Sequence, residues 1–270
     1  MLLFRDHTDL VRIALVCVCC FATQVAAAGE WRYQAGVSTS WHEVSEHENG
    51  NQLVEEQGWM TGLSGVLEHI RGPWRVGIEG EYIDGTLDYD GATQLGLPLQ
   101  TGTDWQRGSV AMFADRDISS AGGFQLGGGL EYEWRHRDIT STETVPGLEE
   151  RYQTVWLGLR GRVSPRRSLT AELHAACAVD STIDVSFDSN LDDASVNVDE
   201  YCRVGVSARA DIRRLGRAVL FVKPFAAWER YPRTDSSRLA SDGVQVGQVH
   251  LPETEFLAFG ITLGIGHRRD

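Results

Sequence analysis

The chain has 270 residues, including 29 glycines, 7 prolines and 8 tryptophans, and its formal net charge at pH 7 is −13. This charge argues against a nucleic-acid partner, because nucleic-acid binding depends on cationic contacts to phosphates. No stretch approaches eighteen uninterrupted apolar residues, which excludes membrane-spanning helices.

The first 28 residues have the pattern of an export signal. Arg5 and Arg12 give a basic start, Ile13–Ala22 is a short apolar core, and Ala26–Ala28 supplies small residues for cleavage. Such a core is too short to span a bilayer as a helix. We therefore expect a cleaved signal peptide over residues 1–28 and one domain over residues 29–270.

Ten strands are predicted in the rest of the chain, each with an apolar and a polar face. They cover residues 31–44, 57–70, 74–84, 104–117, 124–139, 150–163, 169–187, 198–213, 218–231 and 253–266. Four short turns alternate with five long loops, which is the layout of an even-numbered barrel. The predicted fold is all-β: a closed, antiparallel, up-and-down transmembrane β-barrel with short periplasmic turns and long extracellular loops.

The fifth strand shows the alternation most clearly. Phe124, Leu126, Leu130, Tyr132 and Trp134 share one face, and period 2 places the charged residues between them on the other. An apolar face bracketed by aromatics, opposite a face with charges of both signs, is typical of a transmembrane barrel, because lipid contacts one side and the polar lumen the other.

Three strands carry special features. The fourth has no certain facing, because Trp105 and Phe113 differ in parity from Val110 and Met112. The seventh is predicted to alternate strictly, with Asp180 facing inward. In the ninth, Pro224 removes a ladder hydrogen bond and predicts a bulge at mid-strand.

The export signal, the alternating strands and the last strand, 256–266 (FLAFGITLGIG), resemble bacterial outer-membrane β-barrel proteins over essentially the whole exported chain. The resemblance implies location in the cell outer membrane, contact with outer-membrane lipid and insertion by the barrel-assembly machinery. One difference is the end of the chain, since such proteins usually finish on an aromatic residue and this one adds His267–Asp270.

The ten strands and an acidic loop end also resemble the omptins, which are outer-membrane proteases. Asp88 and Asp90 match the spacing of one omptin carboxylate pair, so the resemblance implies them as candidate catalytic residues. Omptins complete the site with an Asp-x-His pair on the far side of the barrel. Residues 29–270 contain no Asp-x-His, so only half of such a site is present.

Charged residues of inward parity form a further candidate site. A ten-strand interior is barely wider than its side chains, and buried charges require partners, so we expect an interlocked ion network that plugs the lumen. The other interpretation is a narrow ion path. The candidates are Glu79, Glu81, Glu131, Glu133, Arg135, Arg160, Arg162, Glu172, Arg203 and Arg209.

Cys177 and Cys202 are the only cysteines after the export signal, on strands joined by one loop. Opposite each other they could form a disulfide in an oxidising compartment, whereas a slipped register would leave two lipid-facing thiols. The histidines are scattered without metal-ligand spacing, and we expect no metal and no cofactor.

The sequence favours a structural or surface-binding outer-membrane barrel with a charge-plugged lumen, and an enzyme is the less favoured class. The alternatives are a narrow porin-like channel and an omptin-like protease. Carboxylates in the long loops predict an acidic extracellular rim that attracts cations or basic peptides. These rim residues are Glu46, Glu48, Asp88, Asp90, Asp192 and Asp193.

Overall fold

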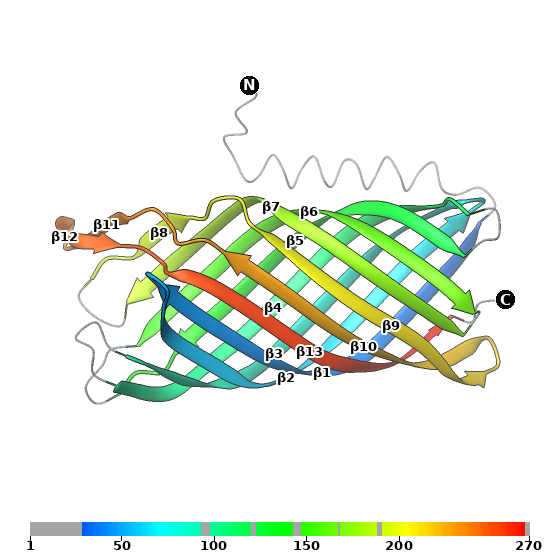
Figure 1. Cartoon of the computed structure of the whole chain (residues 1–270), viewed down its shortest axis with the longest axis horizontal. Helices are drawn as coiled ribbons and strands as arrows, with labels where there is room; N and C mark the ends of the chain where they lie inside the picture. The colour runs from blue at the N-terminus through cyan, green and yellow to red at the C-terminus, as the bar shows by residue number, and fades with distance from the viewer. Residues whose placement is uncertain are drawn as a thin grey trace, which may run out of the picture.

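The computed structural model describes residues 29–92, 98–119, 123–142, 147–166, 168–187 and 191–267. The predicted signal peptide lies outside these ranges. The described chain forms an elongated β-barrel whose strands are strongly tilted against its long axis (Figure 1). Within these ranges, no helix has the length and apolar character needed to cross a membrane.

Ten long strands form the barrel wall. They are β1 (Glu30–Glu48), β2 (Asn51–Arg71), β3 (Trp74–Ala92), β4 (Pro98–Asp117), β5 (Phe124–Ile139), β6 (Leu148–Arg166), β7 (Leu169–Phe187), β9 (Cys202–Leu215), β10 (Ala218–Tyr231) and β13 (Glu253–His267). Each strand pairs antiparallel with the next, while the β1–β13 and β6–β7 pairings complete the ring. The predicted closed antiparallel barrel is confirmed.

The strands extend further into the long connections than the sequence predicted. The first connection, expected over residues 45–56, is a two-residue turn at Asn49 and Gly50, whose φ angles are 52° and 80°. Asn-Gly is the preferred pair for such a turn. The fifth connection contains a second hairpin, formed by β11 (Ser237–Ser241) and β12 (Val244–Val249), and β8 (Ala194–Asn197) pairs with the end of β7.

An inversion of polarity along the strand, clearest in β3, explains why such extensions were missed. In β3, Ile78 and Tyr82 are exposed on the outer wall, but further on Leu87 and Tyr89 are buried inside while Asp88 faces out. The apolar parity therefore changes although the backbone continues in register. The same inversion resolves the fourth strand: Trp105 and Phe113 face inward, and Val110 and Met112 outward.

Two predictions of local register were wrong. The β6–β7 ladder shifts between Val155 and Trp156, because β7 bulges at Val179. The bulge turns Asp180 outward, opposite Val155, and ends the strict alternation. No bulge occurs at Pro224, since the β9–β10 register is the same on both sides of it; the shift lies nearer the turn end, between Leu220 and Phe221.

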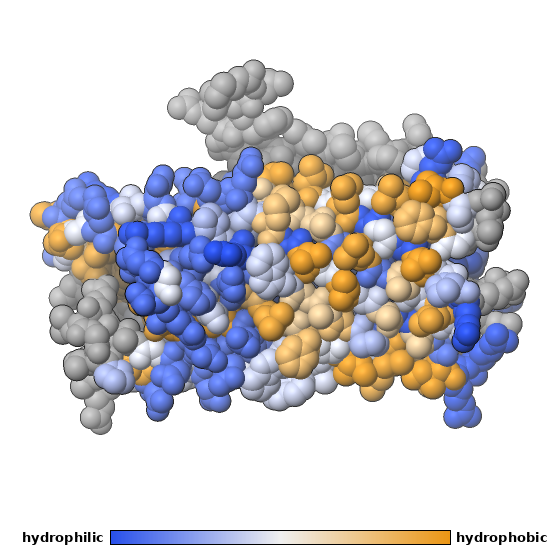
Figure 2. Space-filling view, viewed as in Figure 1, coloured by the Kyte–Doolittle hydropathy of each residue, from blue (hydrophilic) through white to orange (hydrophobic). Residues whose placement is uncertain are grey.

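The outer wall divides into two zones (Figure 2). An apolar band covers the half nearer the short turns, and a hydrophilic zone covers the half nearer the long connections. Exposed aromatic side chains lie at both borders of the band: Trp31, Tyr33 and Trp74 towards the turns, and Trp59, Tyr82, Tyr132 and Trp228 towards the long connections. Such girdles mark the membrane interfaces of outer-membrane barrels. We call the hydrophilic half the loop-end extension.

Candidate functional site

The interior of the loop-end extension is closed by packed side chains around Arg137 of β5. Its Nη1 lies 2.7 Å from a Glu46 oxygen and 2.9 Å from a Glu150 oxygen, and its Nη2 contacts Glu56. All four residues are buried. One guanidinium thus joins carboxylates from β1, β2 and β6 across the barrel.

Neighbouring side chains complete the hydrogen bonding of this cluster. Trp105 Nε1 donates to Glu56 Oε2 at 2.6 Å, and the Tyr152 hydroxyl donates to Glu150 Oε2 at 2.6 Å. Burial raises the pKa of Glu46, and Glu150 and Glu56 add to the rise because their charges repel its ionised form. Burial, reinforced by the charge of Glu46, likewise raises the pKa of Tyr89 to about 12.

Aromatic rings fill the interior beside the Arg137 cluster. The rings of Trp105 and Phe256 are 5.8 Å apart, those of Phe256 and Tyr231 5.7 Å, and those of Tyr231 and Tyr201 5.6 Å. Trp156 continues the series, 5.0 Å from Tyr201. The rings come from five strands or their ends, so with the Arg137 cluster they form one layer, which we call the closing layer.

A second ion network lies below the closing layer and contains several predicted residues. Glu133 forms ion pairs with Arg135 at 2.6 Å, with Arg203 at 2.8 Å and with Arg107 at 2.7 Å. Arg203 also reaches Glu131 at 2.5 Å. The three cations exceed the single negative charge of Glu133. Glu229 balances part of this excess because it forms an ion pair with Arg135.

Further ion pairs lie nearer the turn end. Arg160 binds Glu172 at 2.9 Å and Glu79 at 3.2 Å, and its guanidinium lies 4.5 Å from the Phe113 ring centre. Arg209 contacts Asp211 at 3.0 Å. Arg162 is buried on the same inner wall.

Sequence reasoning missed several charged residues of the interior. Glu46 and Glu56 were assigned to a solvated loop, and Arg137 was omitted although it shares the parity of Arg135. At the turn end, the buried Arg75 bonds Glu68 at 2.9 Å and also contacts Asp115. Alternation in the third predicted strand places Arg75 inward, and the inward parity of its partners Glu68 and Asp115 was the signal that was overlooked.

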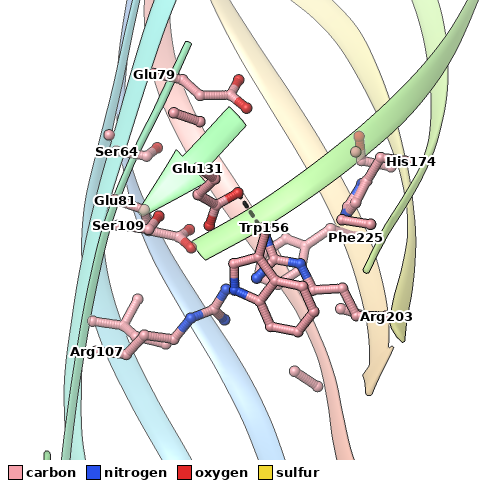
Figure 3. Close-up of a pocket in the computed structure, with 18 of the residues that line it drawn as sticks. Ser64, Glu79, Glu81, Arg107, Ser109, Glu131, Trp156, His174, Arg203 and Phe225 are labelled. Atoms are coloured by element: carbon pink, nitrogen blue, oxygen red, sulfur yellow. Dashed lines mark hydrogen bonds and ion pairs between the residues drawn. The ribbon is translucent and has the colours of Figure 1, made fainter. Parts of the chain in front are cut away.

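A cavity of about 280 Å³ lies inside the barrel among these networks. In Figure 3, Glu79, Glu81 and Ser109 approach it from one wall, and His174 and Phe225 from the other. Most charges at its surface are paired. Glu81 is an exception, since no ion pair or hydrogen bond joins it to a described residue.

The two cysteines meet on the outer wall. Cys177 of β7 lies opposite Cys202, the first residue of β9, and a disulfide joins them. In the same register Ala175 faces Val204 and Leu173 faces Val206. The bond therefore ties the β7–β9 seam at the point where β9 begins.

The structure does not assemble a site around Asp88 and Asp90. Both carboxylates lie on the exposed outer wall of the extension, and the residue between them, Tyr89, points into the barrel. Asp90 Oδ2 accepts a hydrogen bond from Gln100 at 3.4 Å. Among the described residues, no group of three or more His, Cys, Asp or Glu side chains could hold a metal ion.

The carboxylates of the predicted acidic rim do not form one cluster either. Glu46 is buried under Arg137, and Glu48 contacts His250 at 3.2 Å. Asp192 accepts a hydrogen bond from the Gly243 amide in the turn of the β11–β12 hairpin. Exposed or half-buried carboxylates instead gather on the outer wall of β2 to β5. We call this set the acidic platform: Glu55, Asp84, Asp88, Asp90, Asp104 and Asp138.

No protein-family model matches the chain, and no curated protein matches it in sequence. In structure it is similar to the outer membrane protease OmpT from Escherichia coli, with a TM-score of 0.59, 11% identity, and coverage of 90% of this chain and 98% of that chain. The outer membrane protein OprG from Pseudomonas aeruginosa matches with a TM-score of 0.37, 11% identity, and coverage of 89% and 95%. At such identities the OmpT likeness shows the fold alone, that of an outer-membrane β-barrel.

Proposed function

We propose that this protein is a non-conducting barrel anchored in the cell outer membrane that presents a rigid, acidic surface to partners outside the cell. The observation that carries the proposal is the closing layer. Charged and aromatic side chains from opposite walls meet there, with Arg137 and Trp105 among its buried members. A lumen packed in this way leaves the outer wall as the surface that macromolecular partners can reach.

The acidic platform supports a role in binding. Within the β-sheet, Glu55 lies directly opposite Asp90, and Asp104 directly opposite Asp138. Like charges in directly opposite positions destabilise a sheet. Two such pairs on adjoining strands therefore favour cations or a basic peptide as partner.

The position of Asp88 and Asp90 argues against the omptin-like alternative. General acid–base chemistry on a peptide requires both carboxylates and a base to face one substrate. Here the two carboxylates face outward from a single strand, and residues 29–270 contain no Asp-x-His.

Conductance in a planar bilayer tests the proposal. We expect detergent-folded protein to insert without stepwise current, with an open porin reconstituted in parallel as the control for insertion. Current steps that scale with salt concentration would support the narrow channel and contradict the closed lumen.

A further inference from the structure

The cavity below the closing layer contains two opposite charges that form no ion pair with a described residue. Glu81 of β3 and Lys223 of β10 both line it, and among the described residues neither forms an ion pair or a side-chain hydrogen bond. Glu172, which attracts Lys223 electrostatically, is already paired with Arg160. The cavity thus offers one carboxylate and one ammonium group whose hydrogen-bonding positions no described side chain occupies.

These two groups lie on nearly opposite walls. In the strand order β3-β2-β1-β13-β10, four steps separate them around a ring of ten. A ligand that pairs with both must therefore carry its own two charges apart from each other. An ammonium group would face Glu81 and a carboxylate would face Lys223.

The rest of the cavity lining is neutral in sum and largely apolar. Its other carboxylates and cations, such as Glu131 with Arg203, neutralise each other. Trp156, Phe225 and Phe113 supply aromatic surface to the lining. The volume of about 280 Å³ is many times the space that a single water molecule needs. A compact ligand with an apolar body fits these limits.

We propose that this cavity is a binding site for a small zwitterion whose ammonium and carboxylate groups stand at opposite ends of a flat apolar body. Glu81 binds the ammonium group, Lys223 binds the carboxylate, and the aromatic side chains contact the body. Charge-assisted hydrogen bonds of this kind are about twice as strong as neutral ones. The site is separate from the acidic platform and does not depend on it.

The probe is 4-(aminomethyl)benzoate, with benzylamine and benzoate as analogues that each lack one charge. The full chain is refolded from urea into detergent with the probe present, so that the closing layer does not limit entry, and bound probe is measured by equilibrium dialysis. We expect one probe per barrel and about tenfold or more weaker binding of either analogue, the loss typical of one charged hydrogen bond.

Two conservative variants assign the contacts. Glu81→Gln should lower the affinity for the zwitterion to that of benzoate, and Lys223→Gln should lower it to that of benzylamine. Glu55→Gln, on the outer wall, should bind like wild type, and heat-modifiable gel mobility verifies that each variant is folded. The proposal is overturned if wild type binds no probe, so that the cavity holds water only, or if all three variants bind equally.

Discussion

Arg137 is the residue on which the closing layer most depends. It is 3% exposed and contacts three buried carboxylates, so its removal leaves several charges without a counter-ion. Leaving buried charges unpaired typically costs about 3–5 kcal/mol. We expect Arg137→Met to lower the free energy of unfolding by this amount, measured by urea titration in detergent.

Arg151 is the matched control for Arg137. It also pairs with a glutamate, Glu149 at 2.6 Å, but its side chain is 64% exposed. Exposed pairs contribute about 0–1 kcal/mol. Arg151→Met should therefore change stability little, and equal losses in the two variants would contradict a buried, interlocked cluster.

Glu46 makes stability depend on pH in a direction opposite to ordinary acid denaturation. Its folded-state pKa is raised, chiefly by burial, so its contribution is fully present below the unfolded pKa and is lost as pH rises through the folded one. Between pH 7 and about pH 5, above the pKa of unfolded carboxyls, the free energy of unfolding of wild type should therefore rise relative to that of Glu46→Gln as pH falls, measured by urea titration of both proteins at each pH. A difference between the two proteins that does not change with pH would contradict the assignment.

For individual residues, the sequence predicts which side chains face the lumen but not which of them form pairs. Parity alone placed Glu133, Arg160 and Arg203 in the lumen, because alternation fixes which face a side chain occupies. Parity does not say which charges meet across the barrel. The partners of Arg137 come from strands β1, β2 and β6, and that convergence depends on closure and tilt of the whole sheet.

At the scale of elements, the seam between β7 and β9 is distinctive. Their ladder runs only from Leu169 to Cys177, after which β8 replaces β9 as the partner of β7. The disulfide closes a loop of 25 residues at the end of this short ladder. Tyr201, next to Cys202, belongs to the closing layer, so the bond also positions one of its rings.

Removing the disulfide should weaken this seam. A crosslink around a loop of this size typically contributes about 2–4 kcal/mol. We expect the Cys177→Ser/Cys202→Ser variant to lose that much stability in urea, and we expect reductant to destabilise wild type but not the variant. A double variant as stable as oxidised wild type would show that the crosslink contributes nothing.

The elements were predicted well where lipid dictates the pattern and poorly beyond it. The observed bounds of β5, β7 and β10 are those that the alternation of apolar and polar residues predicted. In the loop-end extension, water replaces lipid outside and a packed core replaces the polar lumen inside, so Val54 and Tyr89 point inward where alternation in the membrane predicts polar residues. Polar outward residues then look like loop, and the hairpin turns at Asn49-Gly50 and Asp242-Gly243 were overlooked.

At the scale of the whole molecule, the acidic platform should govern encounter with charged partners. Its field is long-ranged at low salt and screened beyond about 8 Å at 0.15 M. Asp90→Asn combined with Asp104→Asn removes one member of each like-charge pair. We expect this variant to capture an oligolysine peptide more weakly than wild type at low salt, with little difference at high salt, in a fluorescence-anisotropy titration.

The control for the platform is Glu253→Gln combined with Glu255→Gln. These carboxylates also lie on the outer wall of the extension, but both form ion pairs with Arg230, so the three side chains together carry a net charge of only −1. Peptide capture should be unchanged in this variant, and no peptide should be cleaved by any form. Equal weakening in both variants would mean that net charge, rather than the platform, attracts the peptide.

The length of the strands has a consequence for access at the cell surface. Six wall strands, β1–β4, β6 and β7, have 19 to 21 residues. At a tilt of roughly 40° they give a wall on the order of 50 Å long, whereas the apolar band of such barrels is only about 25 Å tall. The loop-end extension therefore places the β11–β12 hairpin on the order of 20 Å above the hydrocarbon boundary. Large, stiff partners that cannot enter the crowded headgroup layer could still dock on it.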